Sequence, residues 1–186
     1  MRCLNRGVVA WLTGLPAAGK TTVANLAAEM LRQAGLKVEV LDGDWVRGTI
    51  HTGVGFTKEE RRLHLLKVAW IARLLARNGV VVIAAFVSPY RDVRAEVRKI
   101  VEEEVPFVEI YVKVPLEVAI RRDPKGLYAK ALRGEIKNFT GIDDPYEEPT
   151  TPDLVLENDG VSPEENAKQV ATHILHMLTH DMNYIS

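Results

Sequence analysis

The chain has 186 residues, of which 47% are hydrophobic and 26% charged, with a formal net charge of −1. This size and composition are typical of one globular domain with a complete core, and the near-neutral charge excludes a general attraction to nucleic acid or anionic membranes. No apolar stretch reaches the ~18 residues that a membrane span needs, and the single cysteine, Cys3, cannot form an intrachain disulfide. We therefore expect a soluble, cytoplasmic protein.

Five apolar runs, rich in β-branched residues, predict the strands of a parallel sheet. They lie at 8–12, 38–41, 80–85, 108–112 and 154–156. Helical patterns alternate with these runs, as in a sheet that helices cover on both faces. We predict one three-layer α/β domain over residues 1–186, with a central parallel five-stranded sheet.

The first two predicted helices have clear boundary signals. One covers 19–34 and stops at Gly35, a residue suited to the left-handed conformation after a helix. The other begins after Thr57, whose hydroxyl can form a capping box with Glu60. We expect its core-facing side to be formed by the larger apolar residues Leu63, Leu66, Trp70, Ile71 and Leu74.

Two more helices are predicted in the second half of the chain. One covers 90–104 and the last begins after Ser162, with Pro163 at its first position and a glutamate two residues later. Its core-facing residues are predicted to be Val170, Ile174, Leu175 and Leu178.

Residues 14–21 read G-x-x-x-x-G-K-T and lie between the first predicted strand and the first predicted helix, the context of a phosphate-binding loop. Backbone N–H groups of such a loop form a concavity for anions, and the helix start adds partial positive charge. The Lys20 ammonium can reach the β- and γ-phosphates, and the Thr21 hydroxyl can ligate Mg²⁺. The predicted nucleoside triphosphate contacts are Gly14, Ala17, Ala18, Gly19, Lys20, Thr21 and Thr22.

Polar turns follow three of the predicted strands, at 13–21, 42–44 and 86–91. Ligands of open parallel sheets bind beyond the carboxyl ends of the strands, so these turns are expected to meet at one crevice. Residues at i and i+2 of an extended chain point the same way, so both carboxylates of Asp42 and Asp44 are expected to face it. We predict that Asp44 positions an acceptor hydroxyl and takes its proton, and that Asp42 holds water around the metal ion. The alternative is a plain exposed turn.

Ser88 follows the third predicted strand, and two roles are open for it. It is either a nucleophile that is transiently phosphorylated or a hydroxyl that shapes the acceptor pocket. We favour the pocket role, because direct phosphoryl transfer depends mainly on positioning and charge neutralisation.

The segment 121–137 carries six Lys and Arg residues against two acidic residues, in a chain that is otherwise nearly neutral. A solvated helix face is one explanation. We favour a lid, at about 121–141, that closes over a polyanionic transfer site and excludes water from it. Phe139 lies at the end of this lid and Phe56 in a glycine-containing loop, so the two rings could hold a flat base between them.

Taken together, these segments resemble the adenylylsulfate (APS) kinase family, through motifs that follow one another along nearly the whole chain. The D-P-K-G-L-Y and K-N-F-T-G-I stretches are more specific than the phosphate-binding loop. The carrying segments are 14–22, 41–47, 55–61, 86–91, 122–128, 136–143 and 145–147. The chain departs from the usual family pattern at Pro16, Trp45, Glu60 and His64.

The resemblance implies a P-loop kinase that transfers the ATP γ-phosphate to the 3′-hydroxyl of APS, with Mg²⁺, and that forms a homodimer. It places the APS adenine between Phe56 and Phe139, and the phosphosulfate at Arg47 and Arg61. Ser88 matches the family's proposed phosphoserine position. The full set of implied acceptor contacts is Asp42, Asp44, Arg47, Phe56, Arg61, His64, Val87, Ser88, Lys125, Asn138 and Phe139.

Two other functions compete with this interpretation. A P-loop kinase for a nucleoside monophosphate, gluconate or shikimate would share Lys20, Thr21 and Asp44, but would have no use for the Phe56 and Phe139 pair. A nucleotide-dependent sensor without turnover would have no use for a complete acceptor pocket.

Overall fold

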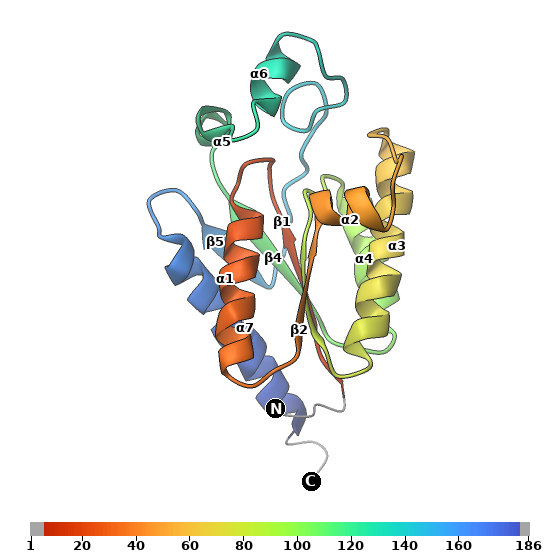
Figure 1. Ribbon diagram of the computed structural model, residues 1–186, viewed down its shortest axis with the longest axis vertical. Coiled ribbons are helices and arrows are strands. Elements are labelled where there is room, and N and C mark those ends of the chain that lie inside the picture. The colour runs from red at the N-terminus through yellow and green to blue at the C-terminus, as the bar shows by residue number, and fades with distance from the viewer. Residues whose placement is uncertain (1–5, 183–186) are drawn as a thin grey trace.

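The computed structural model describes residues 6–182, and its centre is a five-stranded sheet with strand order β2-β3-β1-β4-β5 (Figure 1). All four strand pairs are parallel. The strands are β1 (Val9–Thr13), β2 (Val38–Asp42), β3 (Val81–Ala85), β4 (Phe107–Lys113) and β5 (Leu154–Glu157). The predicted fold class is confirmed, and the five predicted strands differ from these bounds by at most one residue at either end.

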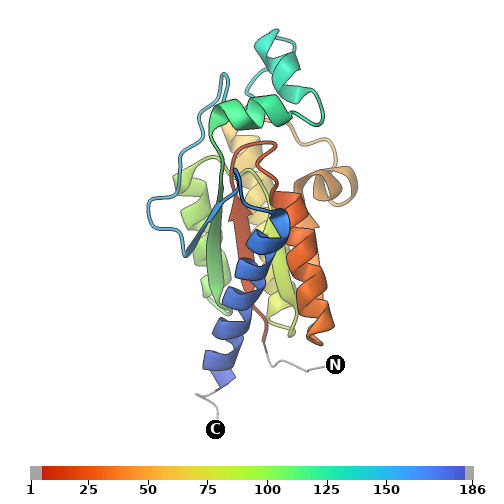
Figure 2. The same cartoon turned by 90° about the vertical axis from the view of Figure 1, so that its left-hand side faces the viewer.

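Helices cover both faces of the sheet (Figures 1 and 2). In chain order they are α1 (Lys20–Gln33), α2 (Gly43–Thr49), α3 (Lys58–Ala76), α4 (Arg91–Glu102), α5 (Leu116–Arg122), α6 (Leu127–Leu132) and α7 (Pro163–Met182). Helices α1 and α7 pack on one face, and α3 and α4 on the other. The short helices α2, α5 and α6 lie at the carboxyl edge of the sheet (Figure 1). No helix within residues 6–182 is long and apolar enough to cross a membrane.

The sequence of β1 shows no polar–apolar alternation, because both faces of this strand are buried. Successive strand side chains point to opposite faces. Ala10 and Leu12 face the core under α1 and α7, whereas Val9 and Trp11 face the core under α3 and α4. All of β1 is buried, because both faces of the sheet are covered by helices.

The predicted core face of α3 is wrong. Leu63, Trp70 and Leu74 are 47%, 53% and 51% exposed, while Leu66 and Ile71 are half-buried at the edge of the core. The buried apolar residues of α3 are instead Leu65, Val68, Ala69, Ala72 and Ala76. Both sets have helical spacing, and the one with small side chains faces inward because alanines allow the helix to lie close to the sheet.

The predicted helix boundaries are confirmed at three places. Gly35 follows α1 with a φ of +86°, in the left-handed region that favours glycine. Thr57 and Glu60 form both hydrogen bonds of a capping box at the start of α3. The Ser162 hydroxyl accepts a hydrogen bond from the Glu165 N–H, 3.2 Å, before α7. Cys3 lies outside the described residues.

Candidate active site

A cavity of about 660 Å³ opens at the carboxyl edge of the sheet. The three polar turns that follow β1, β2 and β3 all contribute to its wall, as predicted from the parallel topology. The segment 123–140, which contains α6, contributes the opposite wall. Of the predicted site residues, those that line it are Ala17, Gly19, Lys20, Thr21, Thr22, Asp42, Asp44, Arg47, Phe56, Arg61, His64, Val87, Ser88, Lys125, Asn138 and Phe139.

The loop between β1 and α1 has the backbone conformation of an anion cradle. Gly19 precedes α1 with a φ of +93°, and Ala17 also has a positive φ, of +61°. A Cβ atom at Gly19 would lie 2.5 Å from the side-chain amide nitrogen of Asn158. Glycine is therefore required there both by conformation and by space.

Two buried asparagines, which no sequence motif predicted, support this loop. The Asn158 amide donates a hydrogen bond to the Ala18 carbonyl, 2.6 Å, and accepts one from the Asn166 amide, 2.7 Å. The Asn166 amide also donates to the Glu157 carbonyl, 3.0 Å. This network connects the end of β5 and the start of α7 to the phosphate-binding loop. Asparagine is common in turns, so nothing local in the sequence marked these residues as partners of the loop.

Lys20 is buried at the base of the cavity. Its ammonium donates hydrogen bonds to the Gly14 and Leu15 carbonyls, at 2.9 and 2.7 Å. Burial lowers the pKa of Lys20 from 10.5 to about 7, and the nearby carboxylates of Asp42 and Asp44 oppose that shift only in part. An anionic ligand bound beside this lysine would therefore favour its charged form.

Asp42 connects the phosphate-binding loop to α2. Its Oδ1 accepts hydrogen bonds from the Asp44 and Trp45 N–H groups, at 3.0 and 3.2 Å, and thereby caps α2. Its Oδ2 accepts a hydrogen bond from the Thr21 hydroxyl, 2.6 Å. Asp44 is therefore in the first turn of a helix, and the expectation that Asp42 and Asp44 share an extended strand is wrong. Because Asp42 is the N-cap, α2 begins at Gly43 and Asp44 already has helical conformation.

Thr21 and Asp42 fit Mg²⁺ in the chemistry of their donor atoms. A hydroxyl and a carboxylate within hydrogen-bond distance provide the hard oxygen ligands that Mg²⁺ prefers, and its remaining positions are normally filled by water and phosphate. Within residues 6–182, no group of three or more His, Cys, Asp or Glu residues could hold a metal without such a substrate.

Lys125 crosses the mouth of the cavity and forms an ion pair with Asp44. Lys125 belongs to the turn between α5 and α6, and both helices lie above the sheet edge (Figure 2). The basic segment of the sequence thus forms a helical cap over the cavity. The Tyr128 hydroxyl of that cap donates a hydrogen bond to the Pro16 carbonyl, 3.0 Å, so the cap also contacts the phosphate-binding loop.

Ser88 is buried in the turn after β3, where its φ is +47°. Its hydroxyl oxygen accepts a hydrogen bond from the Trp11 indole N–H, 2.9 Å, and its carbonyl accepts one from Arg94, 2.6 Å. Within residues 6–182, no carboxylate or imidazole is hydrogen-bonded to its Oγ. These contacts fit a residue that shapes the turn better than an activated nucleophile.

Arg61 connects α3 to the end of the cap. Its guanidinium donates hydrogen bonds to the Phe56 carbonyl, 2.8 Å, to the Thr140 hydroxyl, 3.1 Å, and to the Asn138 carbonyl. The Phe139 ring packs edge-on against Tyr128, with ring centroids 5.0 Å apart. Arg61 therefore fixes both segments that carry the two predicted base-binding aromatic rings.

Phe56 is half exposed at the cavity rim, beneath two guanidinium groups. The Arg47 and Arg61 guanidinium carbons lie 4.6 and 5.4 Å from the centroid of its ring. Arg47 also donates hydrogen bonds to the Val54 and Gly55 carbonyls, at 3.1 and 3.2 Å. Two cations beside an aromatic ring suit a planar base attached to anionic groups.

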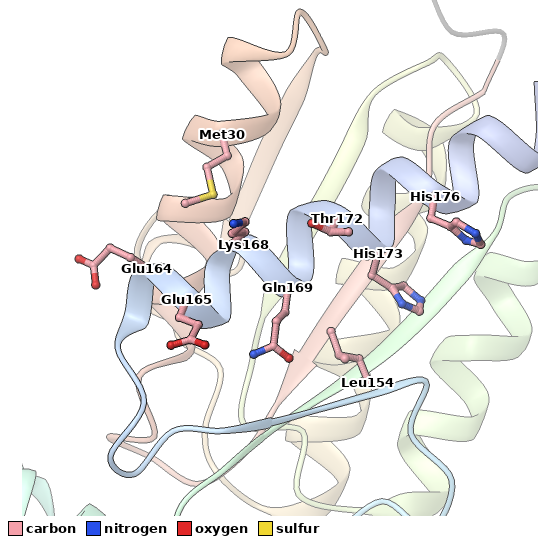
Figure 3. Close-up of a pocket in the computed structure, with 9 residues that line it drawn as sticks. All are labelled: Met30, Leu154, Glu164, Glu165, Lys168, Gln169, Thr172, His173 and His176. Atoms are coloured by element: carbon pink, nitrogen blue, oxygen red, sulfur yellow. The ribbon is translucent and has the colours of Figure 1, made fainter.

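A second, shallower groove lies where α7 passes α1 and β5 (Figure 3). Met30, Leu154 and His173 are among its lining residues, and it contains none of the predicted site residues. Its open shape and mixed lining give it no arrangement of groups suited to phosphate chemistry.

The cavity therefore combines a phosphate-binding loop, the carboxylate of Asp44 and a basic cap, which is the arrangement of a P-loop phosphotransferase. Residues 6–157 match the family model described as adenylylsulphate kinase. The chain belongs to the adenylylsulfate kinase family.

Individual relatives match over most of the chain. A protein of Aeropyrum pernix named probable adenylyl-sulfate kinase is 61% identical over 166 residues, which cover 89% of this chain and 91% of the relative. An adenylyl-sulfate kinase of a Picosynechococcus strain is 49% identical over 89% of this chain and 92% of its own. The solved structure of the Mycobacterium tuberculosis APS kinase CysC in complex with AMPPNP and APS has a TM-score of 0.89 and 40% identity, covering 93% of this chain and 99% of that one.

Proposed function

We propose that this chain transfers the γ-phosphoryl group of ATP to the 3′-hydroxyl of adenylyl sulfate, giving 3′-phosphoadenylyl sulfate and ADP. The observation that carries the proposal is the cavity at the carboxyl edge of the sheet, whose lining includes the phosphate-binding loop together with Asp44, Arg47, Phe56 and Phe139. The M. tuberculosis relative, whose structure was solved with an ATP analogue and APS together, supports the same pair of ligands.

The loop between β1 and α1 is proposed to hold the triphosphate. Its N–H groups and the start of α1 attract the phosphate oxygens, and Lys20 supplies a cation at the β- and γ-phosphates. Mg²⁺, bound by Thr21 and a water on Asp42, would neutralise phosphate charge when present. Burial of Lys20 keeps water away from this cation and strengthens its attraction to phosphate.

The acceptor is proposed to bind on the other side of the cavity. Phe56 and Phe139 hold its adenine, and Arg47 and Arg61 attract its phosphosulfate. The 3′-oxygen attacks the γ-phosphorus as the bond from that phosphorus to the β–γ bridging oxygen breaks, and Asp44 takes the hydroxyl proton. Val87 and Ser88 shape the floor of the pocket, with no covalent intermediate on the serine.

The cap formed by α5 and α6 is proposed to close over both substrates. The ion pair between Lys125 and Asp44 supports a cap whose positive charge is directed toward the transfer site. Closure would exclude water and so favour transfer to the acceptor over hydrolysis.

The working form is proposed to be a cytoplasmic homodimer. Leu63, Trp70 and Leu74 form an exposed apolar stripe on α3, and exposed apolar side chains grouped on one face are typical of contact surfaces. We propose that a second copy of this chain covers the stripe, because a two-fold symmetric contact would bury the stripes of both copies against each other.

A coupled ADP-release assay with Mg-ATP tests the reaction. The acceptor panel is adenylyl sulfate, AMP, gluconate and shikimate, each against an acceptor-free control. Adenylyl sulfate is expected to give turnover far above the control and the other acceptors none. Faster turnover with any other acceptor would reject the substrate assignment, and ATP binding without turnover on any acceptor would favour a sensor.

A further inference from the structure

Three side chains at one end of the acceptor pocket form a hydrogen-bonded chain. The Lys67 ammonium lies 3.1 Å from His51 Nε2, and His51 Nδ1 lies 2.9 Å from His64 Nδ1. The two imidazole rings are stacked, with centroids 5.1 Å apart. Lys67 and His51 are exposed or half-buried outside the cavity, whereas His64 is 1% exposed and lines it.

The donors and acceptors of this chain can be assigned from one end. An ammonium group can only donate, so His51 Nε2 accepts from Lys67. A neutral His51 then carries its hydrogen on Nδ1 and donates it to His64 Nδ1. A neutral His64 in turn carries its own hydrogen on Nε2.

Both histidines are neutral near pH 7. Burial, followed by the charges of Arg47, His51 and Lys67, lowers the pKa of His64 from 6.5 to about 4. Burial, followed by Lys67 and Arg47, lowers the pKa of His51 as well. The Phe86 ring, which carries no charge, also contacts His64, with ring centroids 5.8 Å apart.

The hydrogen-bonded series of Lys67, His51 and His64 ends at His64 Nε2. His64 Nε2 is buried and has no hydrogen-bond partner among residues 6–182. A buried N–H without a partner is destabilising, so such groups in folded proteins usually serve a ligand or water. Since His51 occupies Nδ1, any hydrogen bond from His64 to a molecule in the cavity must use Nε2.

We propose that Lys67 and His51 are positioning residues that hold His64 as the Nε2–H tautomer, so that His64 donates a hydrogen bond to the acceptor nucleotide. This inference rests on the proposed function for the identity of that nucleotide, adenylyl sulfate. His64 Nε2 therefore acts only as a donor toward the cavity, because Lys67 fixes the tautomer of His64 through His51.

Reversing the charge at residue 67 is expected to reverse the donor–acceptor direction of these hydrogen bonds. A carboxylate can only accept, so in Lys67→Glu the hydrogen of His51 moves to Nε2 and His51 Nδ1 becomes an acceptor. His64 then carries its hydrogen on Nδ1 and presents a lone pair at Nε2. Lys67→Arg is the matched control, because a guanidinium, like an ammonium, can only donate to His51.

Nuclear magnetic resonance of protein with ¹⁵N-labelled histidine tests the tautomer without substrate. Long-range ¹H–¹⁵N correlation distinguishes protonated from unprotonated ring nitrogens, and the spectrum of His64→Asn identifies the His64 signals. The expected result is a protonated Nε2 in wild type and Lys67→Arg, and a protonated Nδ1 in Lys67→Glu. A wild-type His64 protonated at Nδ1 or at both nitrogens near pH 7 would overturn the proposal, as would the same tautomer in Lys67→Glu.

Steady-state kinetics test the use of the donor. His51→Leu and Lys67→Glu are expected to raise KM for adenylyl sulfate about 5- to 10-fold, the loss expected for one hydrogen bond, with KM for ATP unchanged. His51→Asn is expected to stay within about 2-fold of wild type, because its amide N–H takes the place of Nδ1–H. His173→Leu, in the groove of Figure 3, is the control for loss of a histidine elsewhere.

Equal effects of His51→Leu on both KM values, or no rescue by His51→Asn, would show a merely structural role and overturn the proposal. Failure of the proposed function is distinguishable from this. A wild-type protein that does not use adenylyl sulfate removes that nucleotide as the partner, while the resonance experiment still decides the tautomer.

Discussion

The low pKa of buried Lys20 predicts that ATP binding takes up a proton. In the free protein the pKa of Lys20 is about 7, because burial disfavours its charged form. A bound triphosphate places negative charge beside the ammonium and raises that pKa again. At a pH between the pKa of Lys20 in the free protein and its pKa in the ATP complex, the lysine is neutral without ATP and charged with ATP. Binding of ATP is therefore linked to uptake of a proton.

The size of the effect follows from that pKa. With a value of about 7 in the free protein, about half of the molecules carry the proton at pH 7, ~10% at pH 8 and ~1% at pH 9. The apparent Kd rises as the competent fraction falls, so ATP should bind ~50-fold more weakly at pH 9 than at pH 7, or ~2 kcal/mol. Binding of ATP at pH 8 should take up ~0.9 protons per ATP.

Isothermal titration calorimetry measures both quantities. Mg-ATP is titrated without acceptor at pH 8, in two buffers with different ionisation enthalpies, and the difference in binding enthalpy gives the proton uptake. The nucleotide phosphates are fully ionised at this pH, so they do not contribute. Lys20→Arg is the matched control, because arginine stays charged at every pH used and should show no uptake.

The contribution of Lys20 to folding stability changes with pH in the opposite direction to that of a typical lysine. A folded pKa below the unfolded value means that the unfolded chain binds more protons between pH 7 and about pH 10. The free protein should therefore gain stability as the pH rises through this window, and Lys20→Arg should lose that part of the gain. Equal proton uptake by wild type and Lys20→Arg, or an ATP affinity that is flat from pH 7 to 9, would refute the reasoning.

Four further predictions concern Asp44, Ser88, the support of the phosphate-binding loop and the proposed dimer. Asp44→Asn should lower kcat by at least ~100-fold while Mg-ATP still binds in calorimetry, because the hydroxyl proton loses its acceptor; kcat near wild type would remove Asp44 from that role. Ser88→Ala should retain most of the activity, and a loss below ~1% would instead support a phosphoserine route. Asn166→Ala should lower the free energy of unfolding in urea by ~2–4 kcal/mol and weaken ATP binding, since it leaves the Glu157 and Asn158 acceptors unpaired; an unchanged midpoint would contradict the support role. Trp70→Lys should convert the dimer to a monomer in analytical ultracentrifugation, and an unchanged mass would exclude the α3 stripe as the interface.

The sequence predicts most of the sheet and of the phosphate site because both depend on local patterns. A run such as 8–12 is buried on both faces and so contains no polar residues, and the G-x-x-x-x-G-K-T spacing fixes a loop conformation by itself. The parallel topology then brings Asp44 and the 86–91 turn to that loop, without any information on their contacts.

Other parts depend on contacts between distant segments and could not be predicted in this way. The choice between two apolar faces of α3 was decided by the space available against the sheet, which favours Ala69 and Ala72 over Trp70. Likewise, Asn158 and His51 acquire their roles only from partners that the fold places beside them.

The central claim is that one cavity binds ATP at the phosphate-binding loop and presents the 3′-hydroxyl of adenylyl sulfate to its γ-phosphorus. Its most direct test is to incubate the protein with ATP labelled at the γ-phosphate, Mg²⁺ and adenylyl sulfate, and to locate the label by mass spectrometry of the separated products. We expect one labelled phosphate on the 3′-oxygen of adenylyl sulfate for each ADP formed. Label found only in inorganic phosphate, on the protein, or at another oxygen of the nucleotide would contradict it.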